Sequence, residues 1–331
     1  MAKVIQVGLG PVGRKIVRYA LDRANAGVRF IGAVDPAPDK AGQDLGELCG
    51  HERLRVRVKT DLAAALGRRK ADVAFLSTVS DLKRIEPQIA EIAAAGLNIV
   101  STCEELSHPW RTAPAAARRI DAVCRKHGVT CLATGVNPGF LMDSLPCALT
   151  AVCQSVRKVV VHRLQDAAPR RVPFQKKIGA GLTRAEFRRR VKDGSLRHVG
   201  LPESMDMIAA RLGWTLTRST ETIRPVVADK AISGGYVPIE AGMVCGVEQV
   251  GRAYVGDKEV IRLVFRAAVG EPASRDIVEI TGEPDIRSVI EGGVNGDVAT
   301  CAIVVNAARS VLAAEPGLKT MVEVPLVAFS G

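Results

Sequence analysis

The sequence predicts an α/β protein with two parts: an N-terminal doubly wound parallel sheet, then an α+β domain with an open, mostly antiparallel sheet. Short apolar strands alternate with helical segments up to about residue 140, a glycine-rich turn follows the first strand, and long strand-like runs come later. A chain of 331 residues is also long enough for two typical domains. We expect residues 1–140 to form the first domain, residues 141–295 the second, and residues 296–331 a helix and tail that pack back on the first.

The glycine-rich turn follows a short apolar run, residues 4–7, which suits a buried parallel strand. Residues 8–13 read GLGPVG, the G-x-G-x-x-G pattern, and a helical segment continues to about Asn25. In this pattern the glycines permit a tight turn, a close approach of backbone to pyrophosphate, and close packing of helix on strand. The alternative is a purely structural glycine turn. The pattern predicts a dinucleotide site formed by Gly8, Gly10, Pro11, Val12 and Gly13.

An acidic residue stands where a dinucleotide-binding protein needs one. The second expected strand, residues 28–34, ends at Asp35, about 20 residues after the last glycine, which is the usual spacing for the acid that binds the adenosine ribose. A carboxylate there accepts hydrogen bonds from both ribose hydroxyls and repels a 2′-phosphate, so NAD is favoured. Lys40 and Arg14 are close enough in sequence to keep NADP open.

Further strands are expected at residues 55–58, 72–78, 97–101 and 129–133, with helices over 87–95 and 113–126. Ligands of a doubly wound sheet bind outside the carboxyl ends of its strands. Candidate functional residues follow three of these strands. They are Ser77 and Thr78 after the fourth strand, Thr102, Glu104 and Glu105 after the fifth, and Asn137, Pro138 and Phe140 after the sixth. We expect Ser77, Thr78 and Thr102 to bind the cofactor.

In the second domain we expect a crossing helix within residues 140–155, strands at 156–164, 216–227, 244–255, 259–269 and 277–280, and helices at 183–192 and 203–212. Thr183 and Glu186 have the spacing of a capping box. So few crossover helices favour an antiparallel sheet with helices on one side, leaving one face for a subunit partner or the active site. The apolar segment 297–312 predicts a buried helix with Asp297 as its N-cap.

Composition excludes several classes of function. The net charge is +11, but the basic residues are dispersed and aromatics make up only 4%, so we expect no nucleic-acid partner. The eight cysteines stand singly and the histidines lack metal spacing, which predicts no metal site and a reducing cytoplasm. We see no window of about eighteen apolar residues and no signal-peptide pattern, so we expect no membrane association.

Glu104 and Glu105 are the candidate catalytic acids. They directly follow an apolar strand at the edge of the sheet that the nicotinamide end of a cofactor reaches, where a carboxylate can exchange protons with substrate. Because consecutive residues point in different directions, we expect one of the two to be structural. Cys103 has no histidine placed to activate it, which favours a buried thiol. Asn137, Pro138, Phe140 and His198 are candidate substrate-pocket residues, although Asn137 and Phe140 are equally compatible with structural roles.

Several longer stretches resemble one family. They are STCEELSHPW (101–110), GVNPGFLMDSLP (135–146), RRVPFQKKIGAGLTRAEF (170–187), HVGLPESMDMIAARLGW (198–214) and GDVATCAIVVNAARSVLAAEPGLKTM (296–321). With the glycine turn they resemble the 2,4-diaminopentanoate dehydrogenase and native amine dehydrogenase family, distant relatives of dihydrodipicolinate reductase. The resemblance implies a Rossmann domain, a homodimer formed through the second sheet, and a catalytic acid in TCEEL, carried onto Glu104 with Glu105 as fallback. The paired histidines and lysine of dihydrodipicolinate reductase have no counterpart around residues 161–166.

These observations predict an NAD(P)-dependent amine dehydrogenase that converts a 2,4-diaminopentanoate-like or small aliphatic amine to a ketone or aldehyde plus ammonia, and the reverse. A dehydrogenase of a hydroxy or semialdehyde substrate is one alternative, and a non-catalytic NAD(P)-binding redox sensor is another. A diamino acid needs a cation for its carboxylate, for which Lys176, Lys177 and Arg170 are candidates.

Overall fold

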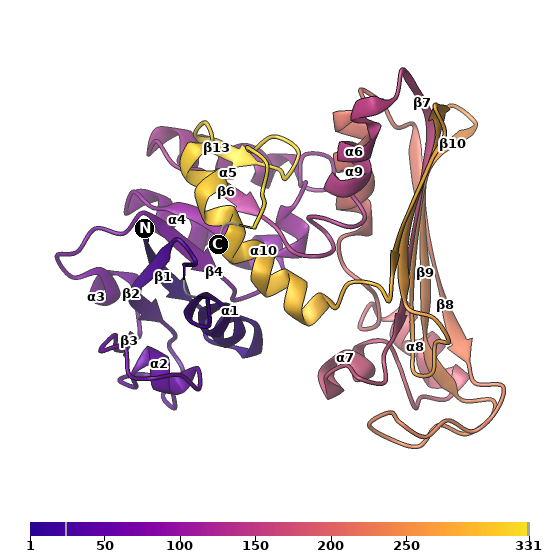
Figure 1. Cartoon of the computed structure of the whole chain (residues 1–331), viewed down its shortest axis with the longest axis horizontal. Coiled ribbons are helices and arrows are strands. Elements are labelled where there is room, and N and C mark those ends of the chain that lie inside the picture. Colours follow the sequence, from indigo (N-terminus) through magenta and orange to yellow (C-terminus); the bar gives the residue numbers. More distant parts are fainter. Residues whose placement is uncertain (24, 330–331) are drawn as a thin grey trace. The chain divides into compact units, whose positions relative to one another are not determined.

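The computed structural model describes residues 1–23 and 25–329. The chain forms two compact units, the first made of Met1–Phe140 and Asn295–Gly331 and the second of Leu141–Val294. Figure 1 shows the elements of both along the sequence. We describe each unit separately.

The sheet of the first unit is parallel throughout, with the strand order β13-β6-β5-β4-β1-β2-β3. Its strands are β1 (Ala2–Val7), β2 (Val28–Val34), β3 (Val58–Lys59), β4 (Val73–Leu76), β5 (Asn98–Ser101), β6 (Thr130–Ala133) and β13 (Gly317–Lys319). This confirms the predicted doubly wound parallel sheet. The order reverses between β1 and β4, which is the switch point where such sheets bind their ligands.

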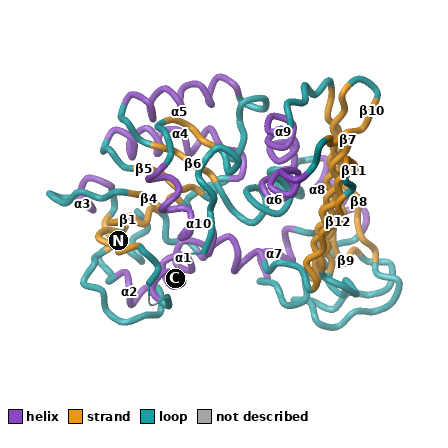
Figure 2. Tube along the Cα trace, turned by 45° about the horizontal axis from the view of Figure 1, so that its top comes forward, coloured by secondary structure: helices purple, strands orange, loops and turns teal. Residues whose placement is uncertain are grey.

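Helices cover both faces of this sheet (Figure 2). They are α1 (Pro11–Leu21), α2 (Leu45–Leu48), α3 (Leu62–Leu66), α4 (Leu82–Ala94), the 3₁₀ turn η1 (Glu104–Leu106), α5 (Pro114–Lys126) and α10 (Gly296–Ala313). Apolar side chains of α3, α4 and α5 form one core with Ile5 and Val7. α1 packs beside Gln6 on the other face, where α10 contacts α1.

Three local expectations for the first unit were wrong. The third strand was expected at residues 55–58, but β3 contains only Val58 and Lys59. Residues 54–56 form a loop instead, because the side chain of Asp44 accepts hydrogen bonds from the N–H groups of Leu54 (2.9 Å) and Val56 (3.1 Å). α4 begins at Leu82, where the side chain of Asp81 caps it, so Pro87 lies inside the helix. The N-cap of α10 is Asn295, which accepts from the N–H of Asp297 (2.9 Å).

α10 is long and apolar enough to span a membrane, with a mean hydropathy of 1.3, so the expectation that no such window exists was also wrong. A single helix of this kind is weak support for a membrane, because the core helices of globular proteins pass the same test. In the first unit α10 packs against α1, β4, β5 and β6. Val304 and Val311, among others, are fully buried there.

The second unit contains a six-stranded sheet in the order β12-β11-β7-β10-β9-β8. Its strands are β7 (Ser155–Asp166), β8 (Arg218–Val227), β9 (Val244–Val255), β10 (Lys258–Ala268), β11 (Arg275–Glu283) and β12 (Ile286–Glu291). Only the β7–β10 pair among these is parallel, which confirms the predicted mostly antiparallel sheet. β12 was not anticipated as a separate strand.

Helices of the second unit lie on one face of its sheet (Figures 1 and 2). They are α6 (Ser144–Leu149) with the 3₁₀ turn η2 (Thr150–Val152), α7 (Val172–Lys177), α8 (Arg184–Lys192) and α9 (Leu201–Arg211). α8 begins with the predicted capping box, in which Thr183 accepts from Glu186 N–H and Glu186 accepts from Thr183 N–H. The crossing helix is shorter than expected, since only α6 and η2 form within residues 140–155.

Candidate active site

The three glycines of the turn have different surroundings. Gly8 has φ +88°, and a Cβ there would lie 2.7 Å from the carbonyl oxygen of Ser77. A Cβ on Gly13 would overlap the carbonyl oxygen of Gly8. A Cβ on Gly10 would meet nothing within 4 Å. The first and third glycines are therefore required by packing within the protein, whereas the second leaves the backbone uncovered where a pyrophosphate approaches.

The start of α1 is suited to an anion. Its N-cap, Gly10, provides no side-chain cap, and Pro11 stands in the first turn. The first N–H groups of a helix have no partner inside the helix, and a phosphate can accept from them. The residues present therefore fit a dinucleotide.

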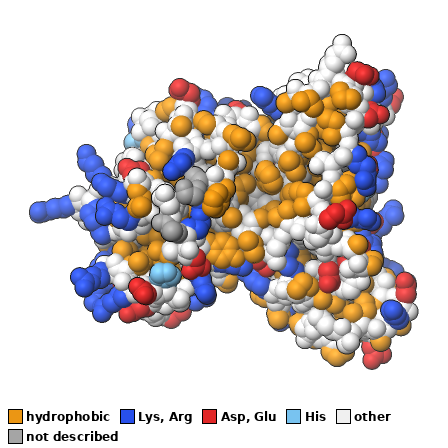
Figure 3. Space-filling view, in the orientation of Figure 1, with side chains coloured by type: hydrophobic (Ala, Val, Ile, Leu, Met, Phe, Trp, Pro, Cys, Tyr) orange, Lys and Arg blue, Asp and Glu red, His pale blue; other side chains and the backbone are white. Residues whose placement is uncertain are grey.

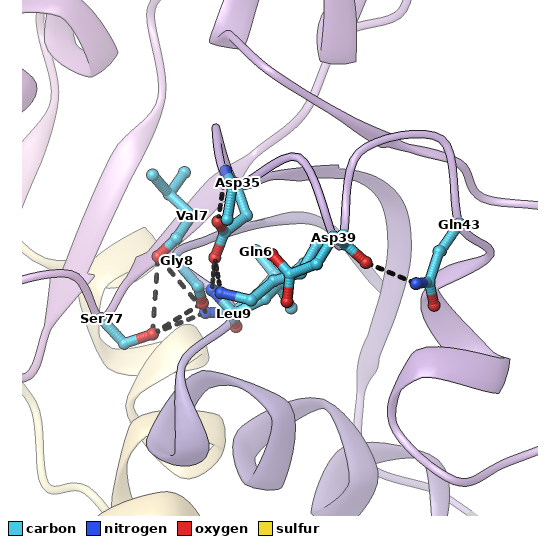
Figure 4. Close-up of polar contacts among 10 residues, drawn as sticks. Gln6, Val7, Gly8, Leu9, Asp35, Asp39, Gln43 and Ser77 are labelled. Atoms are coloured by element: carbon cyan, nitrogen blue, oxygen red, sulfur yellow. Dashed lines mark hydrogen bonds and ion pairs between the residues drawn. The ribbon is translucent and has the colours of Figure 1, made fainter.

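Gln6 holds the glycine turn in place, and the sequence argument missed it (Figure 4). Its side chain is fully buried, and its Nε2 donates to the carbonyl oxygen of Gly8 (2.9 Å) and to Oγ of Ser77 (2.8 Å). Ser77 Oγ also donates to the Gly8 carbonyl (3.1 Å). The feature of the sequence that could have identified Gln6 is its polar side chain within an otherwise apolar strand. Ser77, predicted to bind cofactor, thus supports the turn, and Thr78 donates to Gln88 on α4 (2.8 Å).

Asp35 lies beside the turn, as its spacing predicts. Its Oδ2 accepts from the N–H of Leu9 (2.8 Å, Figure 4) and from Nζ of Lys40 (2.9 Å), and its Oδ1 accepts from the N–H of Ala37 (3.0 Å). Burial alone would raise the pKa of Asp35, but the bonds from Lys40, Ala37 and Leu9 outweigh it and lower that pKa below its usual value. Asp35 is therefore ionised and already paired with a cation, Lys40.

The two adjacent acids after β5 have different environments. Glu105 Oε2 accepts from the N–H of Leu82 (2.9 Å), the first residue of α4. Glu104 is half-buried, and its Oε2 is shielded from solvent without a hydrogen-bond partner among the described residues. Burial raises the pKa of the neighbouring Cys103 to about 12, so it stays a protonated thiol at neutral pH. Thr102 is held through its backbone, its N–H donating to Leu76 (3.1 Å).

The loop after β6 packs against the first turns of α10. The N–H of Val136 donates to Oγ1 of Thr300 (3.2 Å), and Sγ of Cys301 faces the carbonyl of Val12 at 3.9 Å. α10 thereby contacts both the loop after β6 and the glycine turn, although these two segments are distant in sequence. Within this loop Asn137 and Pro138 are buried, and Phe140 is half-buried.

His198 belongs to the second unit, before α9. The side-chain amide of Gln249 bonds both its backbone N–H (2.7 Å) and its carbonyl (2.9 Å), and its ring packs on Phe265 with centroids 4.3 Å apart. The residue as a whole is half-buried, but its Nδ1 is shielded. Burial, aided by the charges of Lys177 and Arg163, lowers the pKa of His198 to about 3. The imidazole is therefore neutral at physiological pH.

The candidate carboxylate-binding cations differ in their contacts. Lys176 lies over the ring of Tyr236 (5.6 Å), and Arg170 lies over the ring of Phe174 (4.0 Å) and donates to Gln165 (3.0 Å). Lys177 is exposed.

A buried ion pair in the second unit was not foreseen from the sequence. Arg163 on β7 and Asp276 on β11 are 2% and 3% exposed, and Nη1 of Arg163 lies 3.6 Å from Oδ1 of Asp276. Together they hold Val294, whose carbonyl accepts from Arg163 Nη2 (3.1 Å) and whose N–H donates to Asp276 Oδ2 (2.7 Å). Burial lowers the pKa of Arg163 to about 10 and raises that of Asp276.

No cluster of three or more His, Cys, Asp or Glu side chains that could hold a metal occurs within residues 1–23 and 25–329. The parallel sheet, the uncapped start of α1 and the acid at the end of β2 together define a dinucleotide-binding protein of the Rossmann class. The sequence model described as "2,4-diaminopentanoate dehydrogenase C-terminal domain" matches residues 140–330. The chain belongs to the 2,4-diaminopentanoate dehydrogenase family.

Individual relatives agree with this assignment. The chain is 31% identical over 337 residues to a 2,4-diaminopentanoate dehydrogenase of Acetoanaerobium sticklandii, covering 98% of this chain and 93% of that protein. Its structure is similar to an amine dehydrogenase from Mycobacterium smegmatis, with a TM-score of 0.84 and 26% identity over 99% and 97% of the two chains. A UDP-N-acetylglucosamine 3-dehydrogenase from Acidithiobacillus ferrooxidans (TM-score 0.55, 13% identity, 97% and 92% covered) shares the fold.

Proposed function

We propose that this protein is a reversible NAD(P)-dependent amine dehydrogenase in which Glu104 exchanges protons with the substrate. It converts an amine, NAD(P)⁺ and water to a ketone or aldehyde, ammonium and NAD(P)H, and catalyses reductive amination in reverse. The observation that carries the proposal is the contrast between the two acids after β5. Glu105 is bonded to the start of α4, whereas Glu104 keeps a shielded oxygen without a partner among the described residues.

In the reductive direction Glu104, as carboxylate, accepts a proton from ammonium, and the resulting ammonia adds to the carbonyl carbon. Glu104 then returns that proton to the hydroxyl of the carbinolamine, which leaves as water. Its carboxylate stabilises the iminium cation that results. A nicotinamide dinucleotide, when bound, would supply the hydride for reduction of the iminium carbon. The uncapped start of α1 and the open side of Gly10 would hold its pyrophosphate.

For the cofactor, we propose NAD as the preferred dinucleotide with NADP also accepted. Asp35 stands at the end of β2 beside the glycine turn, and three protein donors bond its two oxygens, which leaves capacity to accept from a ribose hydroxyl. Lys40 neutralises its charge and still has donors to offer a 2′-phosphate. The basic composition of the chain adds a general attraction for phosphate groups.

For the substrate, we propose a 2,4-diaminopentanoate-like or small aliphatic amine. The relative from Acetoanaerobium sticklandii is a 2,4-diaminopentanoate dehydrogenase, and the structural relative from Mycobacterium smegmatis is an amine dehydrogenase. The test is the absorbance of NAD(P)H formed from a panel of diamino acids, simple amines, alcohols and semialdehydes. Turnover of alcohols or semialdehydes alone would favour the hydroxy or semialdehyde dehydrogenase. Cofactor binding without turnover of any substrate would favour the redox sensor.

We also propose a homodimer formed through the helix-free face of the second sheet. One row in register crosses five strands of this face: Val250, Val264, His162, Ile277 and Val289. Gly251, the neighbour of Val250, packs against α9, so by strand alternation Val250 points to the other face. Charged residues of both signs lie on the same face, as in the Lys158–Glu259 pair (2.7 Å). Basic side chains are visible along the right-hand edge of Figure 3. An apolar row with charge pairs is suited to a second copy of itself.

We propose the cytoplasm as the location. All eight cysteines are free thiols, which suits a reducing compartment.

A further inference from the structure

Two shielded oxygen atoms lack hydrogen-bond partners at the ends of neighbouring strands of the first unit. They are Oε2 of Glu104 and Oγ1 of Thr134, and neither has a partner within the part of the chain that the structure describes. β5 and β6 pair with Ser101 opposite Ala133, and the N–H of Thr134 donates to the carbonyl of Ser101 (2.8 Å). η1, which begins at Glu104, contacts β6. The two residues thus follow neighbouring strands at the ligand-binding edge of the sheet.

An unsatisfied buried hydroxyl is costly, so Thr134 requires an explanation. Its side chain is 3% exposed, and leaving such a group without a partner costs about 1–3 kcal/mol. Thr130, the first residue of β6 and 1% exposed, avoids this cost because its hydroxyl donates to the carbonyls of Ala314 (3.3 Å) and Glu315 (3.1 Å). A ligand that bonds Thr134 when present would remove the cost.

The loop after β6 places a glycine beside this hydroxyl. Gly139 has φ +126°, and a Cβ there would lie 2.9 Å from Oγ1 of Thr134. A side chain at this position would crowd the hydroxyl and strain the backbone. Glycine therefore leaves unoccupied the space beside the oxygen that any other side chain would fill.

We propose that Oγ1 of Thr134 and Oε2 of Glu104 together bind the ammonium ion that reductive amination consumes, a proposal that rests on the function given above. Ammonium carries only donors, an ionised carboxylate only accepts, and a hydroxyl has lone pairs that accept. When an N–H proton of ammonium passes to Glu104, the electron pair of that N–H bond stays on nitrogen. Thr134 then holds the neutral ammonia through another N–H, so that its free pair can attack the carbonyl carbon. Thr134 is a substrate-binding residue in this scheme.

The test is the Thr134→Val variant, which keeps the shape of the side chain and removes the hydroxyl. Hydrogen bonds to charged groups are strong enough that we expect the KM for ammonium to rise roughly tenfold or more. The KM for the carbonyl substrate and for NAD(P)H should be little changed. Thr134→Ser restores the hydroxyl and should bring the KM for ammonium back towards that of the unmodified protein. Thr130→Val is the matched control, since it removes a buried hydroxyl from β6, the strand that precedes Thr134, and should lower thermal stability without altering the KM for ammonium.

An unchanged KM for ammonium in Thr134→Val would overturn the assignment, as would an equal rise in the KM for the carbonyl substrate. Should Thr134→Val fail to fold, Thr134→Ala and Thr134→Ser make the same comparison. If the unmodified protein shows no ammonium-dependent oxidation of NAD(P)H, the proposed function fails and this proposal fails with it. If the unmodified protein shows this activity but the variants do not change the KM for ammonium, only the ammonium site is refuted and the proposed function stands.

Discussion

Nζ of Lys40 lies 2.9 Å from Oδ2 of Asp35, at the end of β2 where the adenosine ribose of a dinucleotide binds. The same carboxylate oxygen accepts from the N–H of Leu9, inside the glycine turn. Asp35, which would bind the ribose, is therefore bonded both to Lys40 and to the glycine turn, which would receive the pyrophosphate. The ion pair also removes the net negative charge that a lone aspartate would present to a 2′-phosphate.

Replacing Lys40 should change the choice between cofactors. In Lys40→Met we expect kcat/KM with NADP⁺ to fall about tenfold or more, because a charged hydrogen bond to the 2′-phosphate is lost. The value with NAD⁺ should change little. Steady-state kinetics with both cofactors make the measurement, and Lys59→Met, which removes an exposed cation from the adjacent strand β3, is the control. An equal loss with both cofactors would show that Lys40 only supports the loop.

Substitution of Glu104 should lower activity, whereas substitution of Glu105 should mainly lower stability. Glu104→Gln should lower turnover by about 10²- to 10⁴-fold, the usual scale of a lost acid–base group, while cofactor binding survives. Glu105→Ala should keep most of the activity but lower the free energy of unfolding by about 1 kcal/mol, because Leu82 N–H loses its acceptor. Initial rates, fluorescence titration with NAD(P)H and denaturant unfolding test these expectations. Near-full activity in Glu104→Gln would mean that the role is misassigned.

Breaking the buried pair of the second unit should be costly. Asp276→Ala leaves the Arg163 guanidinium buried without its counter-ion, and such a change costs about 3–5 kcal/mol of unfolding free energy. The exposed pair Arg287–Glu279 (3.3 Å), with side chains 59% and 44% exposed, provides the control. Arg287→Ala should cost about 1 kcal/mol or less. Chemical denaturation measures the loss of unfolding free energy in each variant. Equal losses in Asp276→Ala and Arg287→Ala would show that burial of the first pair does not increase its contribution.

His198 should make stability depend on pH. Its pKa is about 3 in the folded chain, below the usual value near 6.5, so the unfolded chain binds the proton more readily. The contribution of the neutral ring to stability is complete above about pH 6.5 and is lost as the pH falls from there towards 3. His198→Gln should flatten this part of the stability curve, whereas His127→Gln, at the end of α5, serves as a control. Parallel curves for His198→Gln and the unmodified protein would contradict the expectation.

A charge in the apolar row should prevent self-association. Val264→Glu places a carboxylate at the centre of the helix-free face, between Val250 and His162, and burying it against a second copy is unfavourable. Sedimentation velocity should show a dimer for the unmodified protein and a monomer for the variant. Val255→Glu, at the exposed end of β9, is the matched control and should remain dimeric. A dimer that tolerates Val264→Glu would place the interface elsewhere.

Local patterns were sufficient where neighbouring residues set the structure. The G-x-G-x-x-G turn, the spacing to Asp35 and the capping box of Thr183 and Glu186 all appear as predicted, because each depends on backbone geometry within a short segment. The cap of α10 shows the limit of such reasoning. Asn295 and Asp297 are both good capping residues. In the structure the backbone is extended at Asn295 and helical from Gly296 on, so Asn295 is the cap.

By itself the sequence determined the class of fold, the dinucleotide turn and the stretch that carries the acids, because periodicity and spacing are local properties. Only the tertiary structure distinguished Glu104 from Glu105, since the partner of Glu105 is the backbone of Leu82 on another helix. It likewise revealed the support that Gln6 gives to the turn, the pairing of Arg163 with Asp276 and the buried Thr134 hydroxyl, which has no hydrogen-bond partner among the described residues. In each case the deciding contact, or its absence, involves elements that meet only after folding, when strands distant in sequence become neighbours.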